Sequence, residues 1–379
     1  MNNSWLFYEF FAGGGMARAG LGEAWECLFA NDISHMKGAA YAANYGDNHL
    51  VVGDIYDLNV RDLPGTAHLA WGSFPCQDLS LAGAGAGLDG RRSGCFWGFW
   101  ELVRSLNRAG RKPPLVVLEN VCGALTSHNG ADFEAIVSAV VAEDYLTAAV
   151  VVDAVHFVPQ SRPRLFIFGI DKALLLPDGI SAAAPSQTWH PDALVRAFNR
   201  LQSSVKSHWL WLSPPVPPKR SITLESLVER EPTGVEWHAP AETDYLLQMM
   251  ADGHRRKVLR AQGAGSLRVG TLYRRTRDGV QRAEVRFDGV AGCLRTPSGG
   301  SSRQTIIVVE GPRIRTRLLS PREVARLMGL DDAYELPARY NDAYHVAGDG
   351  VVVPVVAHIA QSVLEPILCA NFVTQLRAA

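Results

Sequence analysis

The sequence predicts an α/β protein with a doubly wound, mostly parallel sheet and a smaller, irregular second domain. Three observations predict this class. Short apolar runs alternate with helical spacing over residues 5–170, polar residues follow the ends of those runs, and the alternation stops near residue 171, where Pro and Ser become frequent. The 379 residues, 47% of them hydrophobic, are enough for two domains and a sizeable core.

Each predicted strand ends where a small or polar residue follows. These strands are residues 6–11 before a glycine loop, 28–30 before Asn31-Asp32, 51–52 before Gly53-Asp54, 68–71 before Gly72, 115–118 before Glu119-Asn120, and then 148–153 and 165–170. In sheets of this kind ligands bind where the strands end, so we expect the functional residues there.

A proline-rich stretch at 213–218 is typical of a stiff connector, and residues up to about 316 mix short strands, glycines and arginines. Regular patterning returns at Ser320. A serine before Pro321, with Glu323 three residues on, predicts a helix start with a capping box. A final helix is expected over about 352–371.

The net charge of −1 conceals a basic segment. Residues 252–330 contain 17 Lys and Arg against 6 Asp and Glu, a net charge of +11. Such a segment indicates a surface that faces a polyanion, or else a solvated basic face without a partner.

The six cysteines form no CxxC pair, so neither a zinc site nor a disulfide framework is indicated. We find no run of 18 apolar residues and no secretion signal, and therefore expect a cytoplasmic protein without a membrane span.

Cys76 follows Pro75 just beyond a predicted strand. A thiol held stiffly at that edge of the sheet is a plausible nucleophile, although a lone Pro-Cys is more often a structural turn with an inert thiol.

The glycine loop between the first strand and the first helix lets a ligand approach the backbone closely. Asp32 ends the second strand, where a carboxylate commonly takes ribose hydroxyls, and Asp54 ends the third, where it could accept from an adenine amine. Together they indicate an adenosine-containing cofactor, whereas each acid alone is more often a helix cap or turn residue.

Glu119 ends the strand that follows the cysteine loop and suits giving or sharing a proton, or capping the next helix. Arg162 and Arg164 lie two apart on an extended segment, so they point to one face. They could hold a base carbonyl or a phosphate, or form surface ion pairs.

These segments together resemble the DNA (cytosine-5)-methyltransferase family over nearly the whole chain. The matching motifs, in the family's order, are Phe11 to Gly22, Phe74-Pro75-Cys76-Gln77 with Arg92-Ser93-Gly94-Cys95-Phe96, Glu119-Asn120-Val121, Gln160-Ser161-Arg162-Pro163-Arg164, Leu319-Ser320-Pro321-Arg322-Glu323-Val324-Ala325-Arg326-Leu327, and Gly348-Asp349-Gly350-Val351-Val352.

The resemblance implies transfer of a methyl group from S-adenosylmethionine to C5 of a cytosine flipped out of double-stranded DNA. Cys76 would attack C6, Glu119 would bond N3 and the exocyclic amine, and Arg164 would hold O2 with Arg162 nearby. The implied cofactor-binding residues are Phe11, Ala12, Gly13, Gly15, Asp32, Ile33, Asp54, Ile55, Pro75, Cys95, Asp349 and Val351. The implied DNA-binding residues are Gln77, Ser80, Arg92, Gln160, Cys293, Arg295, Thr296, Gly299 and Gly300.

The family also implies a Rossmann-like catalytic domain at 1–174, a target-recognition domain at 175–316 and a return to the catalytic domain at 317–379. We expect a monomer of the bacterial cytoplasm; neither its recognition sequence nor a partner restriction endonuclease can be derived from the sequence. Alternatives are an RNA (tRNA) cytosine-5 methyltransferase of the same architecture and a catalytically silent DNA-binding relative.

Three positions depart from the family pattern. Phe74 replaces the first proline of Pro-Pro-Cys, Cys293 replaces the threonine of a Thr-Leu pair, and Asp349 replaces an asparagine beside the cofactor's methionine part.

Overall fold

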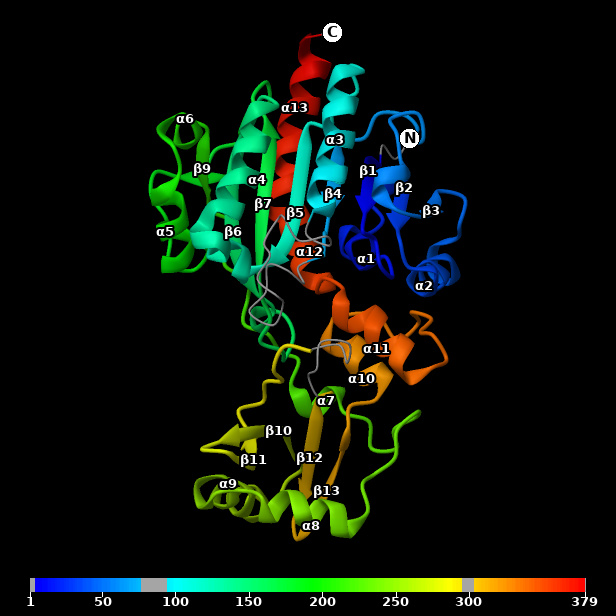
Figure 1. Cartoon of the computed structure of the whole chain (residues 1–379), viewed down its shortest axis with the longest axis vertical. Coiled ribbons are helices and arrows are strands. Elements are labelled where there is room, and N and C mark those ends of the chain that lie inside the picture. The colour runs from blue at the N-terminus through cyan, green and yellow to red at the C-terminus, as the bar shows by residue number, and fades with distance from the viewer. Residues whose placement is uncertain (1–3, 76–93, 295–302, 379) are drawn as a thin grey trace. The chain divides into compact units, whose positions relative to one another are not determined.

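The computed structural model of the chain describes residues 4–75, 94–294 and 303–378 (Figure 1). The chain divides into two compact units. The first comprises Met1–Asp153, Pro163–Pro217 and Val351–Ala379, and the second comprises Ala154–Arg162 and Pro218–Gly350. The division after Pro217 falls inside the proline-rich stretch that the sequence marks as a connector.

The first unit is built on a nine-stranded sheet in the order β3-β2-β1-β4-β5-β7-β6-β9-β8. In that order the strands are Leu50–Val52, Trp25–Asp32, Trp5–Phe10, Leu69–Gly72, Leu115–Val121, Pro163–Asp171, Tyr145–Asp153, Trp209–Leu212 and Ser181–Ala182. Most neighbours are parallel; β7 runs antiparallel to both β5 and β6, and β8 to β9. The predicted doubly wound, mostly parallel sheet is confirmed.

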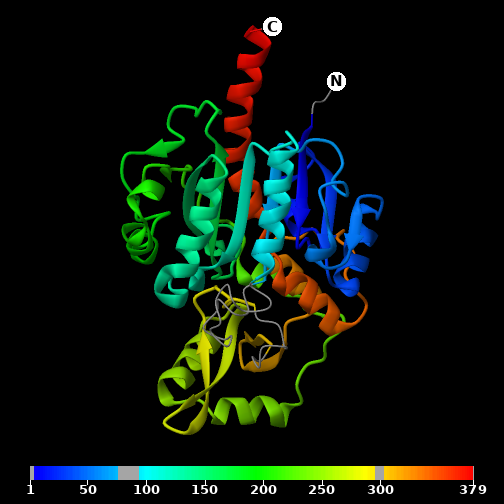
Figure 2. The same ribbon diagram turned by 45° about the horizontal axis from the view of Figure 1, so that its top comes forward.

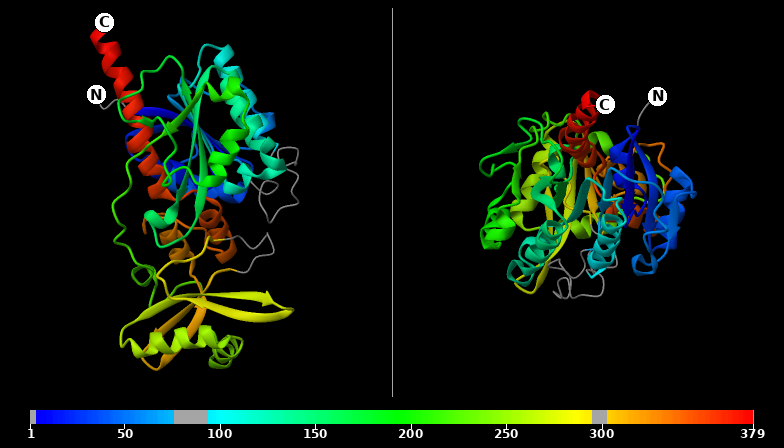
Figure 3. Two further views of the ribbon diagram at one scale, coloured as in Figure 1. Left: turned by 90° about the vertical axis from the view of Figure 1, so that its left-hand side faces the viewer. Right: turned by 90° about the horizontal axis from the view of Figure 1, so that it is seen from above.

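Helices cover both faces of this sheet, with α3 and α4 on one side and α13 on the other (Figure 3, left). The helices of this unit are α1 (Met16–Leu21), α2 (His35–Tyr45), α3 (Cys95–Arg108), α4 (Ala131–Ala142), α5 (Asp192–Arg200), α6 (Ser203–Lys206), α12 (Val353–Ile359) and α13 (Glu365–Ala378). Aromatic rings fill the space between β1 and α3, where the Phe10 and Phe99 centroids lie 5.1 Å apart. The final helix predicted at 352–371 is confirmed, with one π-helical turn at Ala360–Leu364.

The second unit is built on a four-stranded antiparallel sheet in the order β11-β10-β12-β13 (Figure 2). Its strands are β10 (Arg268–Arg277), β11 (Val280–Arg286), β12 (Thr305–Glu310) and β13 (Arg313–Leu318), and its helices are α7 (Leu224–Leu227), α8 (Pro240–Gln248), α9 (Asp252–Gly263), α10 (Pro321–Leu327) and α11 (Tyr340–Asp349). A small core of its own, which includes Leu272, Val285 and Ile307, lies among these elements.

The expected domain boundaries at 174 and 316 do not coincide with the edges of these units. Residues 175–217 pack with the first unit because β9 extends its sheet beside β6. The chain returns to the first unit at Val351. Packing does not decide which residues recognise DNA, so that assignment stays a prediction.

One stretch of the described residues, Tyr340–Asn371, is long and apolar enough to cross a membrane, with a hydropathy of 1.7. Over half of its most apolar window, 56%, is buried inside the protein, as is typical of a core helix in a soluble protein. The expectation that no segment spans a membrane therefore stays a prediction.

Candidate functional site

The turn between β1 and α1 is held in a left-handed conformation. Phe11, Gly13 and Gly15 have φ values of +57°, +56° and +75°. A Cβ added at Gly15 would collide with the Tyr45 ring, with Cε2 only 2.5 Å away, whereas a Cβ at Gly13 would meet nothing within 4 Å. The turn is therefore packed on one side and open on the other, as a ligand cradle requires.

Asp32 ties this turn to the end of β2. Its Oδ2 accepts from the Gly13 amide and its Oδ1 from the Ser34 amide, both at 2.8 Å. The carboxylate is 8% exposed, and the neighbouring Ile33 is 66% exposed. A fixed carboxylate beside an exposed apolar side chain and an open turn fits the ribose and base of an adenosine group.

Asp54 caps the short 3-10 helix Ile55–Asp57, because its Oδ1 accepts from the Tyr56 amide at 3.1 Å. Ile55 is buried, and its Cγ2 packs 2.9 Å from where a Cβ of Gly98 would lie. The Tyr56 ring is 59% exposed, and its hydroxyl donates to the Gly94 carbonyl at 2.6 Å. Sequence reasoning did not single out Tyr56; an aromatic residue directly after Asp54 and Ile55 was the available signal, whereas its exposure is visible only in the structure.

Glu9 is a second residue that sequence reasoning missed. It lies in β1, is 1% exposed, and its Oε2 has no hydrogen-bond partner within the described part of the chain. Burial raises the pKa of Glu9 to about 8, although Arg18 and the backbone of the first turn of α1 lower it. A neutral carboxyl group therefore lies near the end of the strand that leads into the Phe11–Gly15 turn.

The start of the predicted nucleophile loop is anchored in the core. Phe74 is 3% exposed and its ring centroid lies 5.6 Å from that of Phe96. The Phe74 carbonyl accepts from Asn120 Nδ2 at 3.2 Å. The packing of Phe74 and this hydrogen bond hold the residue before Pro75, so the phenylalanine in place of the family's first proline is itself fixed.

Glu119 and Arg164 come together where β5 ends and β7 begins. Val121 pairs with Arg164 and Glu119 with Phe166, so Glu119 and Arg164 are diagonal neighbours on one face. Arg164 Nε lies 3.2 Å from Glu119 Oε1, and the two side chains are 17% and 11% exposed. The structure therefore pairs two of the four predicted catalytic residues.

Arg162 has a different setting inside the second unit, where it is 3% exposed. Its Nη1 donates to Cys293 Sγ at 3.4 Å and to the Leu294 carbonyl at 3.2 Å. Its Nη2 donates to the Gly348 and Gly350 carbonyls at 3.0 and 2.9 Å. One guanidinium thus fastens the Cys293-Leu294 segment to the end of α11.

Gln160 is fully buried beside it. Its Nε2 donates to the Leu327 carbonyl at 2.8 Å and to Met328 Sδ at 3.3 Å, and its Oε1 accepts from the Leu294 amide at 3.2 Å. The Gln160 side-chain amide, which was predicted to contact DNA, therefore makes its hydrogen bonds inside the second unit.

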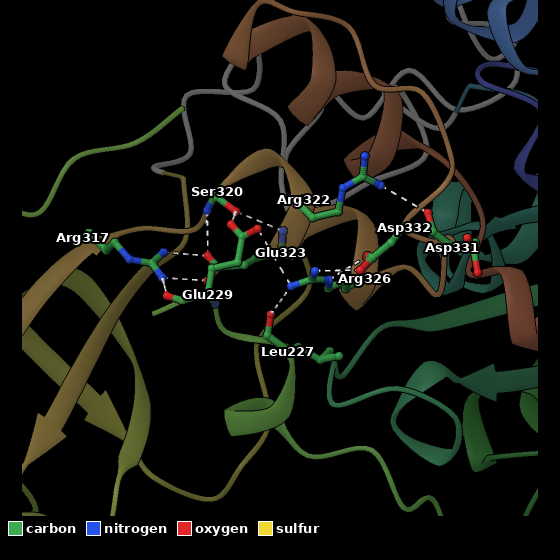
Figure 4. A network of polar contacts seen from close by, with 9 residues as sticks. All are labelled: Leu227, Glu229, Arg317, Ser320, Arg322, Glu323, Arg326, Asp331 and Asp332. Atoms are coloured by element: carbon green, nitrogen blue, oxygen red, sulfur yellow. Dashed lines mark hydrogen bonds and ion pairs between the residues drawn. The ribbon is translucent and has the colours of Figure 1, made fainter. Parts of the chain in front are cut away.

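The predicted helix start at Ser320 is confirmed, and it forms part of a buried polar network (Figure 4). Both Glu323 carboxylate oxygens bond the Arg317 guanidinium, at 2.6 and 2.7 Å, with side chains 1% and 0% exposed. Glu323 also accepts from the Ser320 amide and, from the distant α7 region, the Glu229 amide at 2.6 Å. The network joins β13, α10 and the segment after α7 into one polar core.

Other predicted residues have separate surroundings. Asp349, at the end of α11, has Oδ2 3.7 Å from His345 Nδ1 and is 36% exposed. Val351 is 4% exposed. Cys95 begins α3, and burial, with Asp54 adding to it, raises the pKa of its thiol.

Eight predicted residues lie outside the described residues. They are Cys76, Gln77, Ser80, Arg92, Arg295, Thr296, Gly299 and Gly300. Over residues 4–75, 94–294 and 303–378, no group of three or more His, Cys, Asp or Glu could hold a metal ion.

Comparison with known protein families identifies the family to which the chain belongs. The family model for C-5 cytosine-specific DNA methylase matches residues 6–365, so the chain belongs to this family. The protein is a DNA (cytosine-5)-methyltransferase.

Several curated relatives match over most of their length. The chain is 26% identical to the Type II methyltransferase M.HhaI of Haemophilus parahaemolyticus, over 94% of this chain and 93% of that protein. It is 25% identical to M.HpaII of Haemophilus parainfluenzae, over 96% and 90% respectively. It is 26% identical to M.BsuFI of Bacillus subtilis, over 96% and 74%.

Solved methyltransferase structures have the same fold. A DNMT2 variant from Spodoptera frugiperda superposes with a TM-score of 0.62 at 15% identity, covering 96% of this chain and 100% of that one. A putative DNA modification methyltransferase encoded within a prophage of E. coli gives 0.58 at 18% identity, covering 97% and 100%.

Proposed function

We propose that S-adenosylmethionine is the methyl donor and that the residues around the β1–α1 turn hold it. The turn from Phe11 to Gly15 would border the ligand, Asp32 would accept from the ribose hydroxyls, and the exposed Ile33 side chain would pack on the adenine. The open side of Gly13 and the fixed Asp32 carboxylate support this assignment. When bound, S-adenosylmethionine supplies an electrophilic methyl group.

The remaining residues with predicted cofactor contacts would complete the pocket. Asp54 would accept a hydrogen bond from the adenine amine while it caps the following turn, and Ile55 would pack against the adenine ring. Ala12, Pro75, Cys95, Asp349 and Val351 are assigned to the cofactor by the family resemblance alone.

The Glu119–Arg164 pair is the observation that carries the proposed base recognition. Glu119 would bond N3 and the exocyclic amine of a flipped cytosine, and Arg164 would donate to O2. The two groups have opposite charges and lie 3.2 Å apart, so the pocket holds an acid and a cation at nearly neutral total charge.

Cys76 would act as the nucleophile on this base. Glu119 would take up a proton when the base binds and give it to N3 while the thiolate attacks C6, which leaves the electron pair at C5. C5 would then take the methyl group and leave S-adenosylhomocysteine. Loss of the C5 proton to a base, with return of the N3 proton to Glu119, would restore the C5–C6 double bond and expel the thiolate. The anchored Phe74-Pro75 segment directly before Cys76 supports a fixed loop start.

Arg162 would act as a positioning residue in this scheme. Its four acceptors lie on segments that the resemblance assigns to DNA and to the cofactor's methionine part. These hydrogen bonds would hold the two segments in fixed positions relative to each other, and Arg162 would not touch the base.

Residues 175–316 would contain the target-recognition region, in which Cys293, Arg295, Thr296, Gly299 and Gly300 would contact DNA. Gln77, Ser80 and Arg92 would contact it from the catalytic side, whereas Gln160, which is buried in the second unit and accepts from the Leu294 amide, would position the segment before Arg295. The basic segment at 252–330 supports a polyanionic partner. We further propose a monomer of the bacterial cytoplasm that takes part in a restriction-modification system, as the names of the Type II relatives suggest.

Bisulfite sequencing of DNA from cells that express the protein tests the activity and reveals the target sequence. The wild type should protect cytosines in one short sequence, and Cys76→Ala should protect none. Labelled methyl transfer to tRNA in parallel separates the RNA alternative, since the proposal requires label in duplex DNA and none in tRNA.

A further inference from the structure

The hairpin of β10 and β11 has a well-defined register. Its two-residue turn, Asp278-Gly279, has φ values of +50° and +76°, as a type I′ turn requires. The pairs Tyr273–Glu284, Arg275–Arg282 and Arg277–Val280 lie directly opposite one another.

The two faces of this hairpin differ in how many of their side chains are buried. One face carries Leu272, Ala283 and Val285, which are buried in the core of the second unit. Because side chains alternate along a strand, the other face carries Tyr273, Arg275 and Arg277 of β10, and Arg282, Glu284 and Arg286 of β11. Arg275 and Arg277 are 54% and 56% exposed, so this face points to solvent.

The arginines on this face exceed their acidic partners. Glu284 is shared, with an oxygen 3.5 Å from Arg275 Nε and another 2.7 Å from Arg277 Nε. Arg286 is paired with Asp288 at 2.5 Å. Four arginines thus face two carboxylates.

The cross-strand pair Arg275–Arg282 is the most informative feature of this face. Like charges directly opposite one another on a sheet are destabilising, and their Cβ atoms lie only about 5 Å apart. Two cations held side by side in this way are stabilised by an anion that binds between them, and a guanidinium group suits the oxygens of a phosphate.

The edge of β11 beside these residues is hollowed. A cavity of about 460 Å³ lies between β11 and the α8–α9 connection. Arg255, Arg277 and Arg282 line it, together with Asp252 and Glu284. Cations from a helix and from both hairpin strands therefore border one concave surface.

The same face leads directly to the segment expected to contact DNA. The Tyr273 hydroxyl accepts from the Gly292 amide at 2.8 Å, and Gly292 precedes Cys293. The hairpin and that segment are thus joined within one unit, so a duplex that reaches Cys293 lies within reach of the outward hairpin face.

We propose that the outward face of the β10–β11 hairpin, with Arg275, Arg277 and Arg282 at its centre, binds the phosphate backbone of duplex DNA. This inference rests on the proposed function and adds to it the surface that holds the duplex. Residues 273–277 extend over about 13 Å of strand, a length along which a duplex presents several phosphates. Contacts of this kind position the duplex and carry no sequence information.

The test measures affinity for a short duplex oligonucleotide as a function of salt concentration. Removing one phosphate contact lowers the slope of log K against log salt by about 1. The Arg275→Gln/Arg282→Gln double variant should lower the slope by about 1 to 2 and weaken binding about 10-fold at low salt. Arg274→Gln, in the same strand but on the opposite face, is the matched control and should leave the slope unchanged.

A second variant tests the opposite sign. Glu284→Gln removes the carboxylate that Arg275 and Arg277 share, so binding should tighten and the slope should steepen. If thermal melting shows that the double variant is not properly folded, Glu284→Gln still tests the proposal.

The outcomes separate the two levels of the proposal. An unchanged slope in the folded double variant, or weaker binding by Glu284→Gln, would overturn the proposal that the hairpin face binds phosphates. The proposed function would still stand if the wild type methylates DNA. Failure of the wild type to methylate any duplex overturns the proposed function itself.

Discussion

Glu9 makes the stability of the first unit depend on pH in a direction opposite to that of most acids. Its side chain is 1% exposed, and burial raises its pKa to about 8 from an ordinary value of 4.5. Between these two values the folded protein holds a proton that the unfolded chain releases. The contribution of Glu9 is therefore fully present below pH 4.5 and is lost as the pH rises through 8.

The magnitude follows from the width of that window. Each unit of pKa difference corresponds to about 1.4 kcal/mol, so the loss between pH 5 and pH 8 is on the order of 4 kcal/mol. Glu9→Gln keeps the shape of the protonated side chain but cannot ionise. Its stability relative to wild type should thus rise by about that amount over the same interval.

Urea denaturation of both proteins at pH 5, 6, 7 and 8 measures this difference. Other groups near Glu9 are common to both proteins, so their titration largely cancels: Arg18 stays charged, burial raises the pKa of Cys27 and Tyr41, and burial with the Arg18 charge lowers that of His49. A stability difference that stays flat from pH 5 to pH 8 would show that Glu9 ionises normally in the folded protein.

Three further substitutions have defined outcomes. Arg317→Met leaves the buried Glu323 carboxylate without its cation and should cost about 3–5 kcal/mol in urea denaturation. Arg317→Met/Glu323→Gln should restore part of this loss, because glutamine is neutral and still offers an oxygen to the Ser320 or Glu229 amide; an additive loss in the double variant would contradict the pairing. Asn120→Ala removes the hydrogen bond to Phe74 and should cost about 1 kcal/mol of stability while slowing methyl transfer about 10-fold; an unchanged single-turnover rate would separate that bond from loop positioning. Asp349→Asn should weaken S-adenosylmethionine more than S-adenosylhomocysteine, which lacks the sulfonium charge, and calorimetric titrations that change equally would rule out a contact with that charge.

The sequence was sufficient to predict where strands end and where a helix begins along the chain, because local signals mark these positions. Apolar runs that end in Asp32, Asp54 and Glu119 marked strand ends, and the spacing of Ser320 and Glu323 marked a helix start. Each of these features depends on residues that lie within a few positions of one another, so a single sequence is enough to reveal it.

The contacts that the sequence did not reveal join distant segments. Arg162 bonds Gly348, Gln160 bonds Leu294, and Glu229 bonds Glu323, each across 90 or more positions. No local pattern encodes such pairs, since they exist only once the second unit has packed. The sequence alone therefore predicts surface or base contacts for Gln160 and Arg162, although the structure buries both.

Glu9 was missed for a related reason. An acid inside the run 6–11 has no local marker of its burial, which results from the packing of β2 and β4 on either side of β1. The boundary expected at 174 also failed to match the compact units, because the parallel pairing of β9 with β6 is a long-range contact.

Covalent trapping is the most direct test of Cys76 as the nucleophile. The protein is incubated with S-adenosylmethionine and duplex DNA that contains 5-fluorocytosine in the methylated sequence, where fluorine cannot leave C5 as a proton does. The proposed mechanism predicts a denaturation-resistant adduct whose peptide map assigns the bond to Cys76, and no adduct with Cys76→Ala. An adduct at another cysteine, or methylation without any adduct, would contradict Cys76 as the nucleophile.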